Sequence, residues 1–166
     1  MFEILKNFTD TILIITGFII SYPKISMDQE QLIRQNNNLY LQFTVLNQIN
    51  PKIREIIESG NEVIIYYLIT TYQDNVIIFE KLETRKISYS NTNYLFNQNR
   101  IANFQELTNR VSHERLVVLT NIEFYKGLKL QTDMELLIAC EKWPEIIEFW
   151  SEKPKFSYPF QWKGGK

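Results

Sequence analysis

The segment at residues 62–73 constrains the fold of this chain more than any other. It holds the run Val-Ile-Ile-Tyr-Tyr-Leu-Ile at positions 63–69, in which β-branched or aromatic side chains fill nearly every position. Such residues favour extended backbone, and a strand that is apolar on both faces is typical of the centre of a sheet or sandwich. Asp74 and Asn75 follow, and both tolerate the positive φ of a two-residue hairpin turn. We therefore predict a central strand that turns back into a second strand over 76–89.

The predicted return strand changes character after Phe79. Its second half carries the charged side chains Glu80, Lys81, Glu83, Arg85 and Lys86. Charged residues on a strand oppose its association with the strands of other molecules. This pattern predicts an exposed edge that is protected by charge.

Shorter alternating or β-branched runs predict the remaining strands. They lie at residues 24–35, 39–46, 94–96, 116–125 and 128–142. Strands that follow one another through tight turns predict a mainly β fold, an antiparallel β-sandwich that is Ig-like in outline and carries two or three short helices. Because we find no internal repeat and no linker, we expect one β-sandwich domain over 24–162, followed by a flexible tail over 163–166. We expect residues 97–100 to form a polar loop.

Two short helices are expected after asparagine caps. Asn50 precedes Pro51, which suits the first helical position because its missing N–H would be unpaired there. Gly60 is expected to end this helix in the left-handed conformation. Asn103 stands three residues before Glu106, which is the spacing of a capping box.

The N-terminal part of the chain contains an apolar run at residues 12–22. This run has the length of a signal-peptide core and is short for a membrane span, which needs about 20 apolar residues. Lys6 precedes it, but so do Glu3 and Asp10, and no Ala-x-Ala cleavage site follows. We predict that residues 1–23 are a signal peptide or an N-terminal membrane anchor, which gives a periplasmic or extracytoplasmic location. The alternative is a buried N-terminal strand or helix of a cytoplasmic protein.

Residues that carry most enzyme chemistry are scarce. His113 is the one histidine, and Cys140 is the one cysteine, expected to be a small buried side chain. One histidine and one cysteine are too few for a zinc site. The five glycines do not have the spacing of a phosphate-binding loop. A net charge of −1 provides no basic surface for nucleic acid. Glu145, Glu148 and Glu152 would share a helix face, for which a solvated face is a simpler interpretation than a glycosidase-like pair. We predict no enzyme activity, no cofactor, no metal and no nucleic-acid partner.

Aromatic side chains crowd the end of the chain. The candidate partner interface consists of Trp143, Trp150, Phe156, Tyr158, Phe160 and Trp162. Trp and Tyr dominate the energetics of protein interfaces. Two alternatives remain: these rings pack on the sandwich and close its open end, or they contact a membrane interface.

Several short motifs follow one another in a set order. They are the helix ending in Ser59-Gly60, the apolar strand 62–72, Ile87-Ser-Tyr89, Tyr94-Leu95, Phe104-Gln-Glu-Leu107, Trp143-Pro144 and Trp150. Over roughly residues 24–162 this order resembles the family of small exported bacterial proteins grouped as domain of unknown function 4390. The resemblance implies an exported β-fold and a tie to envelope or signalling functions. It implies no catalytic residue.

These observations lead to one functional hypothesis and two alternatives. The first is a non-enzymatic envelope or periplasmic interaction module that binds a partner protein or helps to build an envelope assembly, with membrane attachment through residues 12–22. One alternative is a protein that binds a small apolar ligand or lipid between its sheets. The other is an enzyme, which a cleft holding His113 or paired acids would favour. A dry cavity on the order of a few hundred Å³ would favour the ligand-binding protein. A filled core would favour the interaction module.

Overall fold

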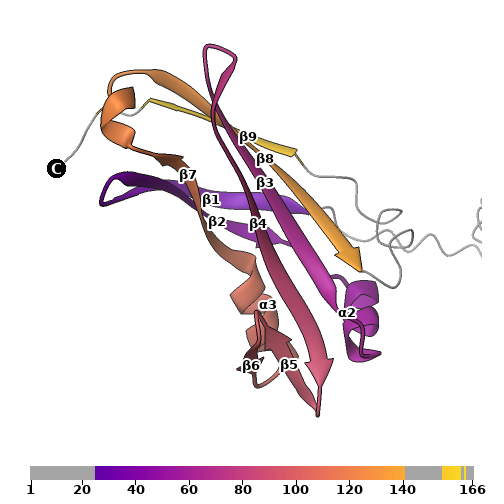
Figure 1. Cartoon of the computed structure of the whole chain (residues 1–166). Coiled ribbons are helices and arrows are strands. Elements are labelled where there is room, and N and C mark those ends of the chain that lie inside the picture. The colour runs from indigo at the N-terminus through magenta and orange to yellow at the C-terminus, as the bar shows by residue number, and fades with distance from the viewer. Residues whose placement is uncertain (1–24, 141–154, 162, 164–166) are drawn as a thin grey trace, which may run out of the picture.

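The computed structural model describes residues 25–140, 155–161 and 163. These residues form two antiparallel sheets, two α-helices and a 3-10 helix (Figure 1). The strands are β1 (Ser26–Gln35), β2 (Asn38–Leu46), β3 (Val63–Gln73), β4 (Val76–Ser90), β5 (Asn93–Phe96), β6 (Asn99–Ile101), β7 (His113–Thr120), β8 (Lys129–Cys140) and β9 (Lys155–Gln161). The helices are α2 (Pro51–Glu58), α3 (Phe104–Ser112) and η1 (Ile122–Tyr125). The mainly β, antiparallel fold class predicted from the sequence is confirmed.

β3 lies inside the larger sheet, as its apolar sequence predicts. That sheet has six strands in the order β6-β5-β4-β3-β8-β9, and the smaller sheet has three in the order β1-β2-β7. β3 pairs with β4 on one side and with β8 on the other along nearly its whole length. The Asp74-Asn75 turn that joins β3 to β4 has φ values of 49° and 64°, so the predicted hairpin is confirmed.

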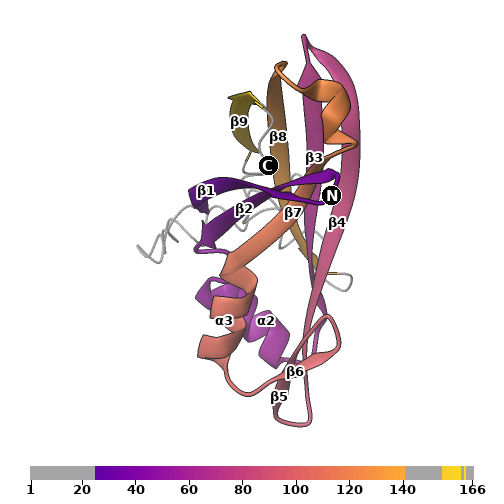
Figure 2. The same ribbon diagram turned by 90° about the vertical axis from the view of Figure 1, so that its left-hand side faces the viewer.

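The core lies between the two sheets. Alternate side chains of β2 point into it, namely Leu39, Leu41, Phe43 and Val45, and all four are buried. They meet the inward residues of β3, which are Val63, Ile65, Tyr67 and Ile69. Figure 2 shows β1 and β2 running across the direction of β3 and β4. The smaller sheet therefore packs across the long strands of the larger one. Cys140 is part of the buried cluster, as expected.

Both α-helices begin at the predicted caps. The Asn50 side chain accepts a hydrogen bond from Ile53 N at 2.9 Å. The Asn103 side chain accepts one from Glu106 N at 2.9 Å, and the Glu106 carboxylate accepts one from Ala102 N at 3.2 Å. These bonds satisfy amide groups that a helix start leaves unpaired. Gly60 follows α2 with φ +85°, which is the expected left-handed conformation.

Two local predictions were wrong, and asparagine explains part of each. Residues 97–100 are not a loop, because Asn97 and Gln98 take positive φ values of 49° and 69° and turn the chain within two residues, so that Asn99–Ile101 pairs with β5 as β6. The predicted strand 116–125 instead begins at His113, directly after α3, and ends at Thr120. Asn121 has φ 54°, and this left-handed residue turns the chain out of the strand and into η1.

Within the described residues, no helix has the length and apolar character needed to cross a membrane. The predicted signal peptide or anchor at residues 1–23 lies outside the described residues, as does most of the predicted tail over 163–166. Those predictions therefore stay predictions.

Candidate protein-interaction surface

One side of β4 is open over most of the strand. β4 pairs with β3 from end to end, but β5 pairs with it only at Ile87–Ser90. The backbone of Lys86 is bonded to Asn97, both through Lys86 N to the Asn97 side chain and through Asn97 N to Lys86 O, each at 2.9 Å. Residues 76–85 have no second neighbouring strand in the described part of the chain, and we call this stretch the β4 edge.

The direction of the open backbone groups follows from Lys86. Its N–H and C=O point away from β3, toward Asn97. Because backbone groups alternate along an antiparallel strand, Thr84, Leu82 and Glu80 also direct their N–H and C=O groups away from β3. The β3–β4 register is regular from Lys86 back to Phe79, which keeps this alternation intact. The β4 edge therefore offers a row of hydrogen-bonding groups to an added strand.

Large apolar side chains are exposed along the same strand. Val76 is 64% exposed, Ile77 is 55% exposed and Leu82 is 58% exposed. Leu82 lies opposite Leu68 of β3, on the face that points away from the core. Tyr66 and Leu137, which are opposite each other on β3 and β8, lie on that face too. We call Tyr66, Leu68, Leu82 and Leu137 the outer patch, and apolar patches of this kind mark interaction sites.

The inward face of the β4 edge carries a ladder of charges. Lys81 and Glu83 form an ion pair at 2.5 Å, and Glu83 lies 3.4 Å from Arg85. Arg85 in turn binds Glu114 of β7. Its Nη2 lies 2.8 Å from Oε2, and its Nε lies 3.2 Å from both carboxylate oxygens. Glu114 is 4% exposed. The ladder thus runs from the solvent into the space between the two sheets.

A buried hydrogen bond lies near Glu114. Gln48 Nε2 donates to the Tyr67 hydroxyl at 2.5 Å. Burial raises the pKa of the Glu114 carboxyl, although Arg85 opposes this effect. Burial likewise raises the pKa of the Tyr67 hydroxyl far above its ordinary value, and the charge of Glu114 adds to the rise. The raised pKa of Tyr67 keeps its hydroxyl neutral at neutral pH.

A surface depression of about 500 Å³ adjoins this network. Its lining consists of Arg85, Phe96, Glu106, Asn109, Arg110, His113 and Glu114. His113 is exposed, and its Nδ1 lies 2.8 Å from Asn109 O, a carbonyl within its own turn. No cysteine, serine or threonine lines the depression, and the described residues contain no cluster of three or more metal-ligating side chains. Glu106, His113 and Glu114 are the side chains of this lining that could accept a proton.

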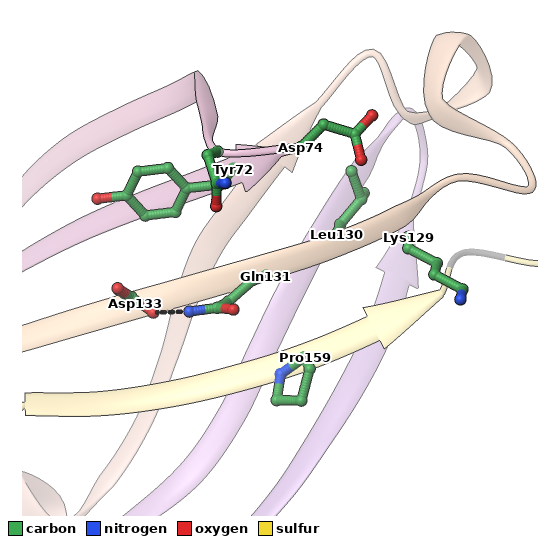
Figure 3. Close-up of a pocket in the computed structure, with 8 residues that line it drawn as sticks. Tyr72, Asp74, Lys129, Leu130, Gln131, Asp133 and Pro159 are labelled. Carbon is green, nitrogen blue, oxygen red and sulfur yellow. Dashed lines mark hydrogen bonds between the residues drawn. The ribbon is translucent and has the colours of Figure 1, made fainter.

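A second depression, of about 390 Å³, lies near the β3–β4 turn (Figure 3). It is lined by Tyr72, Asp74, Asn75, Lys129, Leu130, Gln131, Asp133 and Pro159. Gln131 Nε2 donates to Asp133 Oδ1 at 2.8 Å, as the dashed line in Figure 3 marks. Both depressions are lined largely by polar side chains and open to solvent, whereas a lipid or apolar ligand needs a largely apolar enclosure.

Three of the six aromatic residues predicted as a partner interface can be located. Phe156, Tyr158 and Phe160 alternate along β9, are half-buried and pack against the core cluster. Trp143, Trp150 and Trp162 lie outside the described residues, as do the acidic residues at 145, 148 and 152. The located rings do what the packing alternative requires, and their role as an interface stays a prediction.

Sequence reasoning found the open edge but not its apolar contact residue. The charges after Phe79 predicted the edge, and the pairing of β4 confirms it over residues 80–85, whereas Ile87–Ser90 pair with β5. Leu82 stands between Lys81 and Glu83, and an isolated apolar residue in a charged strand was the signal that could have identified it. Its exposure requires the strand to lack a covering layer on its outer face, which the local sequence does not reveal.

Comparison of the chain with known proteins finds no relative. No family model, no curated protein and no solved structure matches the chain. The resemblance to the family of domain of unknown function 4390 therefore rests on the motifs quoted above alone.

Proposed function

We propose that this protein is a non-enzymatic interaction module that binds an extended protein segment along the β4 edge. An added strand would continue the larger sheet and bond to the open backbone groups of Glu80, Leu82 and Thr84. Its outward side chains would lie beside the outer patch and cover Leu82. The single observation that carries the proposal is the coincidence of open backbone and an exposed leucine at the centre of one strand.

The interior of the fold supports an interaction module over a ligand-binding protein. Buried side chains from both sheets occupy the space between them, including Phe43 and Tyr67, whose ring centroids are 6.4 Å apart in an edge-to-face contact. Among the described residues these side chains form one packed cluster, as is usual in protein interiors, which pack as densely as organic crystals. The outer surface of the larger sheet is therefore the better candidate for the functional surface.

We also propose that the module works in the cell envelope, outside the cytoplasmic membrane. The support is the apolar run at 12–22, of a length suited to an export signal or to membrane attachment. Fractionation of cells that express the full chain with a C-terminal tag tests this. Recovery of full-length protein wholly in the cytosol would reject the location and leave the binding proposal standing.

A photocrosslinking amino acid at Leu82 tests the binding proposal in living cells. We expect light-dependent adducts from position 82 and none from position 129, where Lys129 is also exposed but lies on β8 beside β9. The control therefore lies on a strand that pairs with β3 and β9 over most of its length. Equal labelling from both positions, or none from either, would reject the proposal.

Two substitutions separate the side-chain contribution from the backbone contribution. L82K places a charge where the partner must pack. F124K is its control: it makes the same kind of change at Phe124, which is 80% exposed but lies on η1, away from the β4 edge. T84P removes an N–H that points away from β3, so the bonds with β3 are kept, and T84A is its control. For these variants the photocrosslinking probe is moved from Leu82 to Glu80, which lies opposite Thr70 of β3. We expect L82K and T84P to abolish the crosslink. We expect F124K and T84A to retain it.

A further inference from the structure

We infer that the segment bound by the β4 edge is β4 of a second copy of this chain, paired antiparallel about Leu82. This inference rests on the proposed function and names its partner. It follows from the order of charges along the strand, which makes the β4 edge complementary to itself in one register.

A symmetric antiparallel pair places a twofold axis between one residue and its own copy. With the axis at Leu82, Lys81 lies opposite the partner's Glu83, and Glu83 lies opposite the partner's Lys81. Opposite charges directly across an antiparallel pair stabilise it, and like charges destabilise it. The Lys81–Glu83 pair within each chain, at 2.5 Å, would then become half of an alternating group of four charges.

Other registers are excluded by charge or by pairing. An axis at Glu80, Lys81 or Glu83 places that charged residue against its own copy. An axis at Thr84 would need the backbone of residues after Arg85, but Lys86 is bonded to Asn97 and Ile87–Ser90 pair with β5. An axis at Phe79 meets the irregular part of the strand, because the pairing with β3 shifts register between Phe79 and Ile77. The register about Leu82 uses residues 79–85, which are regular and open.

The backbone geometry agrees with the same axis. Leu82 directs its N–H and C=O away from β3, so Leu82 and its copy would form a hydrogen-bonded pair that exchanges both bonds. Glu80 and Thr84 direct their groups the same way and lie opposite one another across the axis. Every outward-pointing group from 80 to 84 therefore finds a partner.

The apolar contribution comes from the outer patch. The twofold axis is perpendicular to the sheet, so both outer patches would share one face of the joined sheet. Leu82, which is 58% exposed, would lie beside its own copy, with Leu68 behind each of them. Burying this leucine pair removes apolar surface that each chain alone leaves in water.

Charge reversal tests the register with the full chain in solution. K81E sets a carboxylate opposite the partner's Glu83, and E83K sets an ammonium group opposite the partner's Lys81. Each variant alone should therefore dimerise about tenfold more weakly, since two attractive pairs become repulsive. An equimolar mixture of K81E and E83K restores opposite charges at both positions, and so does the double variant. Sedimentation equilibrium measures the dissociation constants, and urea unfolding of each variant confirms an intact fold.

Cysteine crosslinking provides the second measurement. L82C should form an intermolecular disulfide on mild oxidation, because opposite residues in such a pair have Cα atoms about 5.5 Å apart. E80C is the control, since Glu80 faces the partner's Thr84 rather than itself. A wild-type chain that is monomeric at all concentrations tested, or L82C and E80C crosslinking equally, would overturn the inference. If the photoprobe at position 82 still captures a different protein, the proposed function stands and only the identity of its partner is wrong.

Discussion

The Arg85 guanidinium binds the Glu114 carboxylate through two of its nitrogens and so links β4 of one sheet to β7 of the other. The shortest of these contacts is 2.8 Å. Both side chains are largely withdrawn from solvent, with 15% and 4% of their surface exposed. A buried ion pair contributes little net stability compared with apolar residues of the same size, but the loss of one partner leaves an uncompensated charge.

Replacement of Arg85 by methionine should therefore be costly. R85M leaves Glu114 buried without its cation, and we expect the free energy of unfolding to fall by about 3 kcal/mol at neutral pH. R85M/E114Q removes the stranded charge and should recover at least half of that loss. Urea unfolding of the three proteins measures both effects. If the double variant were no more stable than R85M, the ion pair would not be the source of the loss.

The pH dependence of stability should carry the signature of Glu114. Burial raises the pKa of this carboxyl above its value in the unfolded chain. The folded protein then holds the proton more tightly, so the contribution of Glu114 to stability is fully present below the unfolded pKa and is lost as the pH rises through the folded pKa. Wild type should gain stability relative to E114Q as the pH falls from neutrality toward 4.5.

Glu58 provides a control of opposite sign for that experiment. A hydrogen bond from Tyr94, followed by one from Arg54, lowers the pKa of Glu58. Its contribution to stability is present above the unfolded pKa and is lost as the pH falls through the folded pKa. Wild type should therefore lose stability relative to E58Q on acidification. Curves of the same sign for E114Q and E58Q would contradict the assignment.

Tyr67 and Gln48 should differ in their effect although they share a hydrogen bond. Y67F removes the hydroxyl that accepts from Gln48 and leaves the buried Gln48 Nε2 without its acceptor, so we expect a loss of about 2 kcal/mol. Gln48 is buried, and its Oε1 accepts no hydrogen bond from the described residues. Q48M removes that unpaired oxygen together with the donor, so we expect a change below about 1 kcal/mol. Thermal and urea unfolding compare the two, and an equal loss would show that the Gln48 amide matters as much as the hydroxyl.

Phe160 decides between packing and partner binding for the β9 aromatics. It lies opposite Leu130 of β8 and packs against the core. F160A should lower the free energy of unfolding by about 2 kcal/mol, because it removes a half-buried ring. F124A, at the exposed ring of η1, should change it by less than about 0.5 kcal/mol. Unchanged stability of F160A would favour the interface interpretation.

The features that the sequence predicted well are those decided within a few neighbouring residues. The apolar run at 63–69 was enough to place β3 centrally, and Asn50 and Asn103 were enough to start the helices. The errors arose where asparagine or glutamine takes a left-handed conformation, at Asn97–Gln98 and at Asn121. Nothing local distinguishes those positions from ordinary polar loop or strand residues.

The candidate surface and the buried network depend on contacts between distant parts of the chain. Arg85 and Glu114 are separated by 29 positions, and Gln48 and Tyr67 by 19. A sequence shows a charged strand but not which of its charges meets a partner inside the fold. The charge pattern therefore predicted the β4 edge, while the ladder that leads inward from it required the structure.

The position of β7 has a consequence for how the molecule is made. The second neighbour of β2 is β7, which follows it after four other strands and two helices. During synthesis, the β3–β4 hairpin can form early because its contacts are local. β2 stays unpaired on one side until β7 has been made. Closure of such a long loop is slow and leaves apolar surface transiently accessible. Until β7 is made, the chain therefore exposes apolar surface of the kind that makes folding intermediates prone to aggregate.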